Sequence, residues 1–287
     1  MAPSFQEIEA QAQERWRDLT ARDQPWIRIG TALCGQAAGC EPVLAAIEVA
    51  LRKQGLAAQV SRVGCLGLCY AEPLVDVQLP GGPRVFYGNV TPDDAEKIVA
   101  LHVALGKPVE DLAIGYLAGA AGQEQAAGAT LDIQDLNRHP MRLWETRIAL
   151  RNAGNIDPKD ICQYVATGGY RALQKALTEM TPAETLEEVN VSGLRGRGGA
   201  AFPTGTKWRF LAGSTAPVKY ILGNCEEGDP GAFNDKAILE SDPHTLIEGI
   251  VLAGYATGAS NGYIFIRHGH EGPVETCRAA LRQAQEL

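Results

Sequence analysis

The sequence predicts an α/β protein with two domains. Its 287 residues are enough for two hydrophobic cores. Short stretches with the alternating pattern of strands are separated by longer stretches with the periodicity of helices. Four cysteines lie within the first 69 residues, whereas a glycine-rich segment lies near residue 200. The two halves therefore carry different candidate sites.

Composition argues against two kinds of partner. Hydrophobic residues make up 45% of the chain and charged residues 21%, as in an ordinary soluble globular protein. The formal net charge of −8 argues against nucleic-acid binding, because a phosphate backbone attracts a basic surface. No apolar run is long enough for direct membrane insertion. Residues 1–24 predict a charged amphipathic helix rather than a signal peptide, so we expect a cytoplasmic protein.

Residues 25–106 are predicted to form the first domain. Its expected strands and helices follow in the order β-α-β-β-β-α, which is typical of a small thioredoxin-like α/β domain. The expected strands are 26–30, 57–64, 74–79 and 84–88, and the expected helices are 42–55 and 93–105.

The four cysteines of this region predict a metal or redox centre. Cys34, Cys40, Cys65 and Cys69 have the spacing C-x5-C, then 24 residues, then C-x3-C. In a reducing compartment such a cluster indicates metal or redox chemistry before disulfides. Zinc sites usually contain tighter C-x2-C pairs, whereas two looser pairs suit a [2Fe–2S] cluster with two sulfurs on each iron. Zinc and unliganded buried thiols remain as alternatives.

The second domain is expected at 146–287, after a Gly/Ala-rich linker at 107–145. Strands are predicted at 218–224 and 262–268, each followed by a helix. Alternating strands and helices imply an open parallel sheet, whose ligands bind beyond the carboxyl ends of the strands. The acidic residues Glu226, Glu227 and Asp229 come directly after the first of these strands.

The glycine-rich loop RGRGGAAFPTGTKWRF (195–210) predicts an anion site of an uncommon kind. It departs from the dinucleotide pattern G-x-G-x-x-G because Ala201 stands at the third glycine position, and from the P-loop because Trp208 follows Lys207. Glycines let backbone N–H groups approach a phosphate closely. The aromatic side chains of the loop offer faces on which flat rings stack.

The glycine loop and the acidic segment together predict a site for a phosphorylated, hydroxyl-rich, aromatic ligand. Carboxylates suit ribose or ribityl hydroxyls, as in dinucleotide sites. A flavin mononucleotide and a nicotinamide dinucleotide both meet this description.

The segments LRGRGGAAFPTGTKWRF and YILGNCEEGDPGAF closely resemble the two signatures of the NADH-binding flavoprotein subunit of respiratory complex I. The same module occurs in soluble hydrogenases and NAD-dependent formate dehydrogenases. The similarity runs from about residue 147 to Leu287, and the four-cysteine region resembles the thioredoxin-like [2Fe–2S] domain that is often fused ahead of this module.

The resemblance implies a Rossmann-like or flavodoxin-like domain that binds FMN and NAD(H) or NADP(H). It places the glycine loop near the flavin and two phenylalanines against the dinucleotide. The acidic segment is implied to contact both the flavin and the nicotinamide nucleotide. The implied contacts are Gly196, Arg197, Gly198, Gly199, Phe202, Gly205, Lys207, Phe210, Asn224, Glu226, Glu227 and Asp229. No side chain is implied as an acid or base. Two departures from the family pattern are Ala201 for a usual Gly and Cys225-Glu226 for a usual Ala-Asp.

The implied function is that of a diaphorase-type NAD(P)H dehydrogenase subunit. Hydride passes from NAD(P)H to FMN and electrons continue to iron–sulfur clusters of a hydrogenase, formate dehydrogenase or complex I-like assembly. The family's second flavin segment, ubiquitin-like domain and [4Fe–4S] domain have no counterpart before Leu287. A further chain or segment is therefore expected to complete the FMN site. The alternative is a non-catalytic [2Fe–2S] electron-transfer or assembly subunit without its own flavin.

Overall fold

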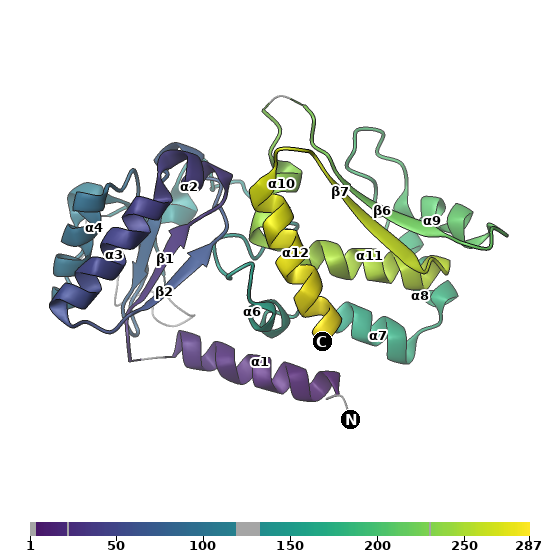
Figure 1. Cartoon of the computed structure of the whole chain (residues 1–287), viewed down its shortest axis with the longest axis horizontal. Helices are drawn as coiled ribbons and strands as arrows, with labels where there is room; N and C mark the ends of the chain where they lie inside the picture. The colour runs from purple at the N-terminus through teal and green to yellow at the C-terminus, as the bar shows by residue number, and fades with distance from the viewer. Residues whose placement is uncertain (1–3, 22, 119–132, 230) are drawn as a thin grey trace.

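The computed structural model describes residues 4–21, 23–118, 133–229 and 231–287. Figure 1 shows a first α/β half in purple and blue and a second half in green and yellow, with helix α1 running beneath both. Within the described ranges no helix combines the length and the apolar character that a bilayer crossing requires.

A five-stranded mixed sheet forms the centre of the first half, with the strand order β2-β1-β3-β4-β5. β1 pairs parallel with β2, whereas the other neighbouring strands pair antiparallel. The strands are β1 (Trp26–Gly30), β2 (Gln59–Val63), β3 (Val75–Gln78), β4 (Arg84–Tyr87) and β5 (Ala113–Leu117).

The helices of this half confirm the predicted thioredoxin-like order. They are α2 (Leu33–Ala38), α3 (Cys40–Gln54) and α4 (Pro92–Ile98), which continues as a π-helical stretch (Val99–Val103). The apolar face of α3 packs on the sheet, because Val43 and Ile47 join Ile27, Val75 and Val85 in one core. α3 ends at Gly55, whose φ of 63° suits a glycine at a helix C-terminus.

β5 corrects the prediction that 107–145 is a linker. Ala113–Leu117 extends the sheet by pairing with β4, and Leu136 returns to pack in a second core beside Phe86. Gly115 allows this return, since an added Cβ would lie 2.6 Å from Leu136 Cγ. The strand is short and interrupted by glycine, so its sequence gives a weak signal. Residues 119–132 of the predicted linker lie outside the described residues.

Helix α1 (Phe5–Thr20) confirms the predicted N-terminal helix and begins with a Ser4–Glu7 capping box. It precedes the first half in sequence but packs on the second. Ala12 is buried beside Tyr164 and Val165 of α6 (Ile161–Ala166), and the side chain of Gln13 donates to the Ala166 carbonyl at 2.7 Å.

The second half contains a parallel pair of strands, β6 (Tyr220–Cys225) and β7 (Asn261–Ile266). This pair confirms the predicted parallel arrangement. One face of the sheet lies against α11, where an added Cβ at Gly223 would lie 2.8 Å from Ile250 Cδ1. The other helices are α7 (Arg171–Glu179), α8 (Pro182–Val191), α9 (Thr204–Ala212), α10 (Asn234–Ser241), α11 (Pro243–Thr257) and α12 (Glu271–Glu286).

Candidate functional site

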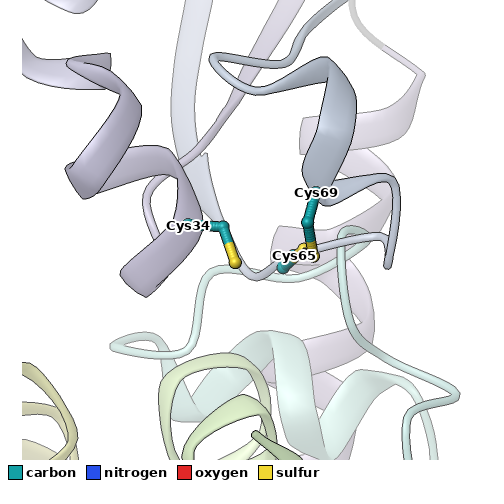
Figure 2. Close-up of side chains that lie close together, drawn as sticks. All are labelled: Cys34, Cys65 and Cys69. Atoms are coloured by element: carbon teal, nitrogen blue, oxygen red, sulfur yellow. Dashed lines mark hydrogen bonds between the residues drawn. The ribbon is translucent and has the colours of Figure 1, made fainter. Parts of the chain in front are cut away.

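Three of the four predicted metal ligands converge in the first half. The sulfur atoms of Cys34, Cys65 and Cys69 all lie within 4.8 Å of one another, and Cys65 Sγ is 3.8 Å from Cys69 Sγ. Figure 2 shows the Cys34 side chain, from the first turn of α2, directed toward the side chains of Cys65 and Cys69, which come from the segment after β2. Because β1 and β2 are parallel neighbours, the loops that follow them emerge at the same edge of the sheet.

Cys40 lies outside this group. It is the first residue of α3 and is fully buried in the core between helix and sheet. Gly39, with a φ of 91°, joins α2 to α3 and directs the chain into the helix there. The structure therefore brings together three of the predicted ligands, and the fourth begins the adjacent helix.

Burial makes these thiols hard to ionise. It raises the pKa of Cys34 and that of Cys40 to about 11. Burial also raises the pKa of Cys65 well above its usual value, although the N–H of Gly67 donates to its sulfur at 3.2 Å. Such thiols become thiolates when a metal centre supplies positive charge. A donor set of sulfurs alone suits a cysteine-ligated iron–sulfur cluster.

Residues 195–203 of the glycine-rich segment form a loop that precedes α9 and is surrounded by open space, whereas residues 204–210 belong to the helix itself. Among the described residues, an added Cβ at Gly198 or Gly199 meets nothing within 4 Å, and one at Gly196 meets only the Phe202 carbonyl, at 3.6 Å. No described side chain caps α9, so its first turn leaves N–H groups for an anion. Ala201 has a φ of 48°, a conformation that favours the glycine usual in the family.

Gly205 has a different role from the other loop glycines. An added Cβ would lie 2.4 Å from Asn190 Cα, so the absence of a side chain lets α9 pack closely on α8. The two predicted stacking residues remain accessible. The ring centroids of Phe202 and Phe210 are 6.3 Å apart, and these side chains are 42% and 68% exposed. Lys207 is exposed in the first turn of α9.

The acidic loop follows β6 and places its carboxylates unequally. Glu226 and Asp229 lie near the surface, and Asn224 is exposed on β6. Glu227 instead contacts α10: its carboxylate accepts from the backbone N–H groups of Asp235 at 2.8 Å and Lys236 at 3.0 Å. Its side chain is only 4% exposed. Glu227 therefore stabilises the start of α10, and its carboxylate oxygens are already bonded.

Arg267 joins this edge of the sheet and was missed by the sequence analysis. It follows β7 directly and lies 3.7 Å from Glu226, between Arg267 Nη1 and Glu226 Oε1. Its position directly after the second predicted parallel strand could have identified it, because ligands of open parallel sheets bind beyond the carboxyl ends of the strands. In Figure 1 the glycine loop and the acidic loop both rise above the two strands.

Comparisons with known proteins agree with these features. Residues 189–287 match the Nuo51 FMN-binding domain family. NADP-reducing hydrogenase subunit HndC of Solidesulfovibrio fructosivorans is 48% identical over 142 residues, which is 50% of this chain and 29% of that protein. An NADH-quinone oxidoreductase subunit of Rhizobium meliloti is 46% identical over 139 residues, 48% of this chain and 33% of that protein. The chain thus spans about a third of the length of these relatives.

Solved structures give two further likenesses. An NAD+-reducing [NiFe]-hydrogenase superposes on 98% of this chain and 43% of its own chain, with 19% identity and a TM-score of 0.40. A thioredoxin-like [2Fe-2S] ferredoxin from Aquifex aeolicus superposes on 33% of this chain and 99% of its own, with 25% identity and a TM-score of 0.29. Both TM-scores are low. The fold assignment is therefore based on the strand order and pairing of this chain.

The family match contains the glycine loop, the acidic loop and both parallel strands. Residues 189–287 are thus similar to the Nuo51 FMN-binding domain family, and about half of the chain is similar to an NADH-quinone oxidoreductase subunit and to the NADP-reducing hydrogenase subunit HndC.

Proposed function

We propose that this chain is a diaphorase-type subunit of an NAD(P)H dehydrogenase. The observation that carries the proposal is the match of residues 189–287 to an FMN-binding domain, with the glycine and acidic loops both inside it. When bound, FMN accepts the hydride of NAD(P)H, and a [2Fe–2S] cluster carries single electrons onward.

The glycine loop binds the flavin phosphate in this proposal. Gly198 and Gly199 have open space where a side chain would lie, so a phosphate can approach their backbone closely, whereas the N–H of Gly196 already donates to the Phe202 carbonyl at 2.9 Å. The uncapped first-turn N–H groups of α9 add a favourable dipole. Arg197 and Lys207 supply positive charge.

The flavin and the dinucleotide lie between the loops in this proposal. Phe202 and Phe210 offer exposed ring faces to a nicotinamide or adenine ring. Asn224 and Glu226 bond the flavin, and Asp229 bonds the nicotinamide nucleotide. Glu227 acts indirectly, by fixing the loop to α10.

The cysteine loops hold the [2Fe–2S] cluster in this proposal. Cys34, Cys65 and Cys69 already converge, and Cys40 supplies the fourth sulfur from the first turn of α3. Both loops emerge from a rigid sheet, which holds ligands from distant parts of the sequence in a fixed arrangement.

An exposed apolar face of the β6–β7 sheet indicates a binding site for a further partner. Tyr220, Leu222, Tyr263 and Phe265 are each more than half exposed, and the register of β6 with β7 puts them on one face. Surfaces of this kind mark interaction sites. We assign the face to a chain or segment that completes the FMN site and carries [4Fe–4S], within a cytoplasmic hydrogenase, formate dehydrogenase or complex I-like assembly.

The test uses the chain with FMN and NADH under anaerobic conditions. We expect FMN to bind, riboflavin to bind more weakly because it lacks the phosphate, and the flavin absorbance to bleach on addition of NADH or NADPH. Iron and acid-labile sulfide are measured on the same sample. A chain that holds iron and sulfide but binds no flavin would contradict a self-sufficient dehydrogenase, and the electron-transfer or assembly subunit would follow if flavin is still not bound when the completing chain is added. Zinc without iron would contradict both functions.

A further inference from the structure

Three consecutive buried polar residues lie at the end of α10, where the two halves meet. Glu240 is 6% exposed, and Ser241 and Asp242 are completely buried. Each has a side-chain oxygen without a hydrogen-bond partner among the described residues. Leaving such oxygens unpaired in a buried position costs free energy, so their placement calls for an explanation.

This segment contacts both cysteine loops. The N–H of Leu33, the residue before Cys34, donates to Glu240 Oε2 at 2.8 Å. Gly64, the residue before Cys65, packs so closely that an added Cβ would lie 2.0 Å from Ser241 Oγ. The end of α10 therefore lies next to one cysteine of each loop.

The other end of α10 contacts the acidic loop of the FMN-binding half. Glu227 accepts from the first-turn N–H groups of the helix, as described above. α10 has eight residues, so it spans about 12 Å. One short helix thus joins the acidic loop to the cysteine loops.

The charge of Glu240 is poorly compensated. Its Oε1 lacks a hydrogen-bond partner among the described residues. Lys236, one turn earlier on α10, lies 3.6 Å from Glu227. Glu240 lines a cavity of 120 Å³ together with Arg62 and Lys159, but these two cations pair with Glu41 and Glu275.

We propose that Glu240 is a positioning residue of the [2Fe–2S] site: its carboxylate holds the Cys34 loop against the FMN-binding half and lowers the reduction potential of the cluster. The inference rests on the proposed function, since it needs a cluster on these cysteines. Reduction adds negative charge to the cluster, and a neighbouring carboxylate opposes that addition.

The test is a redox titration of the reconstituted full chain at fixed pH, followed by electron paramagnetic resonance of the reduced cluster. Glu240→Gln keeps an oxygen that accepts from Leu33 N–H but removes the charge. We expect its cluster to be reduced about tenfold more favourably, which is about 59 mV for a one-electron couple. A unit charge roughly 10 Å away at an effective dielectric constant of about 20 has an effect of this order.

Glu275→Gln is the matched control, because it neutralises a carboxylate that lines the same cavity but whose side chain is 74% exposed. Its potential should equal that of the wild-type chain. An unchanged potential in Glu240→Gln would overturn the proposal. If Glu240→Gln holds no cluster, Glu240→Asp should hold a cluster at the wild-type potential. Loss of the cluster in Glu240→Asp as well would overturn the proposal. A wild-type chain without a [2Fe–2S] signal would instead refute the proposed cluster itself.

Discussion

Single residues show how strongly burial controls the ionisable groups of this protein. His102 is 3% exposed, and its Nδ1 lies 2.8 Å from the hydroxyl of Tyr87, which accepts from the Val109 N–H at 3.3 Å. Burial lowers the pKa of His102 to about 4. The ring is therefore neutral in the folded protein at neutral pH.

His102 should make stability depend on pH. The unfolded imidazole takes up a proton near pH 6.5, whereas the folded one does so only near pH 4. Its contribution is thus present above pH 6.5 and is lost as the pH falls toward 4. Urea unfolding should show that the loss of stability from pH 7 to pH 5 is about 2 kcal/mol larger in the wild-type chain than in His102→Gln. Equal losses in both proteins would contradict a buried neutral histidine.

The cysteine group makes a second prediction at this scale. Cys65→Ser removes a sulfur at the centre of the group, so iron and labile sulfide per reconstituted chain should fall at least about tenfold. Cys162→Ser is the control, because Cys162 lies outside the group, beside Arg15. Cys40→Ser should lose iron as Cys65→Ser does. Full iron content in Cys40→Ser would show that Cys40 is only a core residue.

Helices and strands follow local signals to different degrees. Capping boxes start α1, α4 and α8, at Ser4, Thr91 and Thr181. The expected strands before the cysteine loops also form. β5 was missed because Gly115 interrupts a five-residue strand whose stability comes from its pairing with β4.

The cap of α4 can be tested alone. The Thr91 hydroxyl accepts from the Asp94 N–H at 3.2 Å, and the Asp94 carboxylate accepts from the Thr91 N–H at 3.1 Å. Thr91→Ala should lower the free energy of unfolding by about 1 kcal/mol. Thr178→Ala, in the last turn of α7, removes a hydroxyl whose hydrogen bonds to described residues all lie within its own helix, to Gln174. This control should change stability less in the same denaturation assay.

At the scale of the whole molecule, the two halves are joined by close contacts of small and polar groups. The N–H of Leu33 donates to Glu240 at 2.8 Å, and Gly64 packs against Ser241. Helix α1 belongs by packing to the second half, although the first half follows it in sequence.

Gly64→Ala should disturb this junction. The new methyl group would lie 2.7 Å from Ser241 Cα, a backbone atom that cannot rotate away. Overpacking of this kind costs about 1–3 kcal/mol, which thermal unfolding should detect. Gly249→Ala adds a methyl group on α11 that meets no described residue within 4 Å, and it should leave stability unchanged or raise it. Equal stability of Gly64→Ala and the wild-type chain would show that the junction yields easily.

The sequence by itself determined the features that depend on short-range order. Strand alternation, helical periodicity and the positions of the cysteines and glycines were enough to predict the α/β class, the convergence of Cys34, Cys65 and Cys69, and a glycine-rich and an acidic segment that both lie in the region matching an FMN-binding domain. Each of these depends on backbone conformation or on residue types within a few positions.

Only the tertiary structure decided which of these residues meet. It separated Cys40 from the other three sulfurs, bonded Glu227 to α10 and brought Glu240 beside the loop of Cys34. Glu240 and Leu33 are 207 positions apart, and local periodicity carries no information about such pairs. Which distant residues come into contact depends on how whole helices and sheets pack. Such contacts form only when the two halves bury their surfaces against each other.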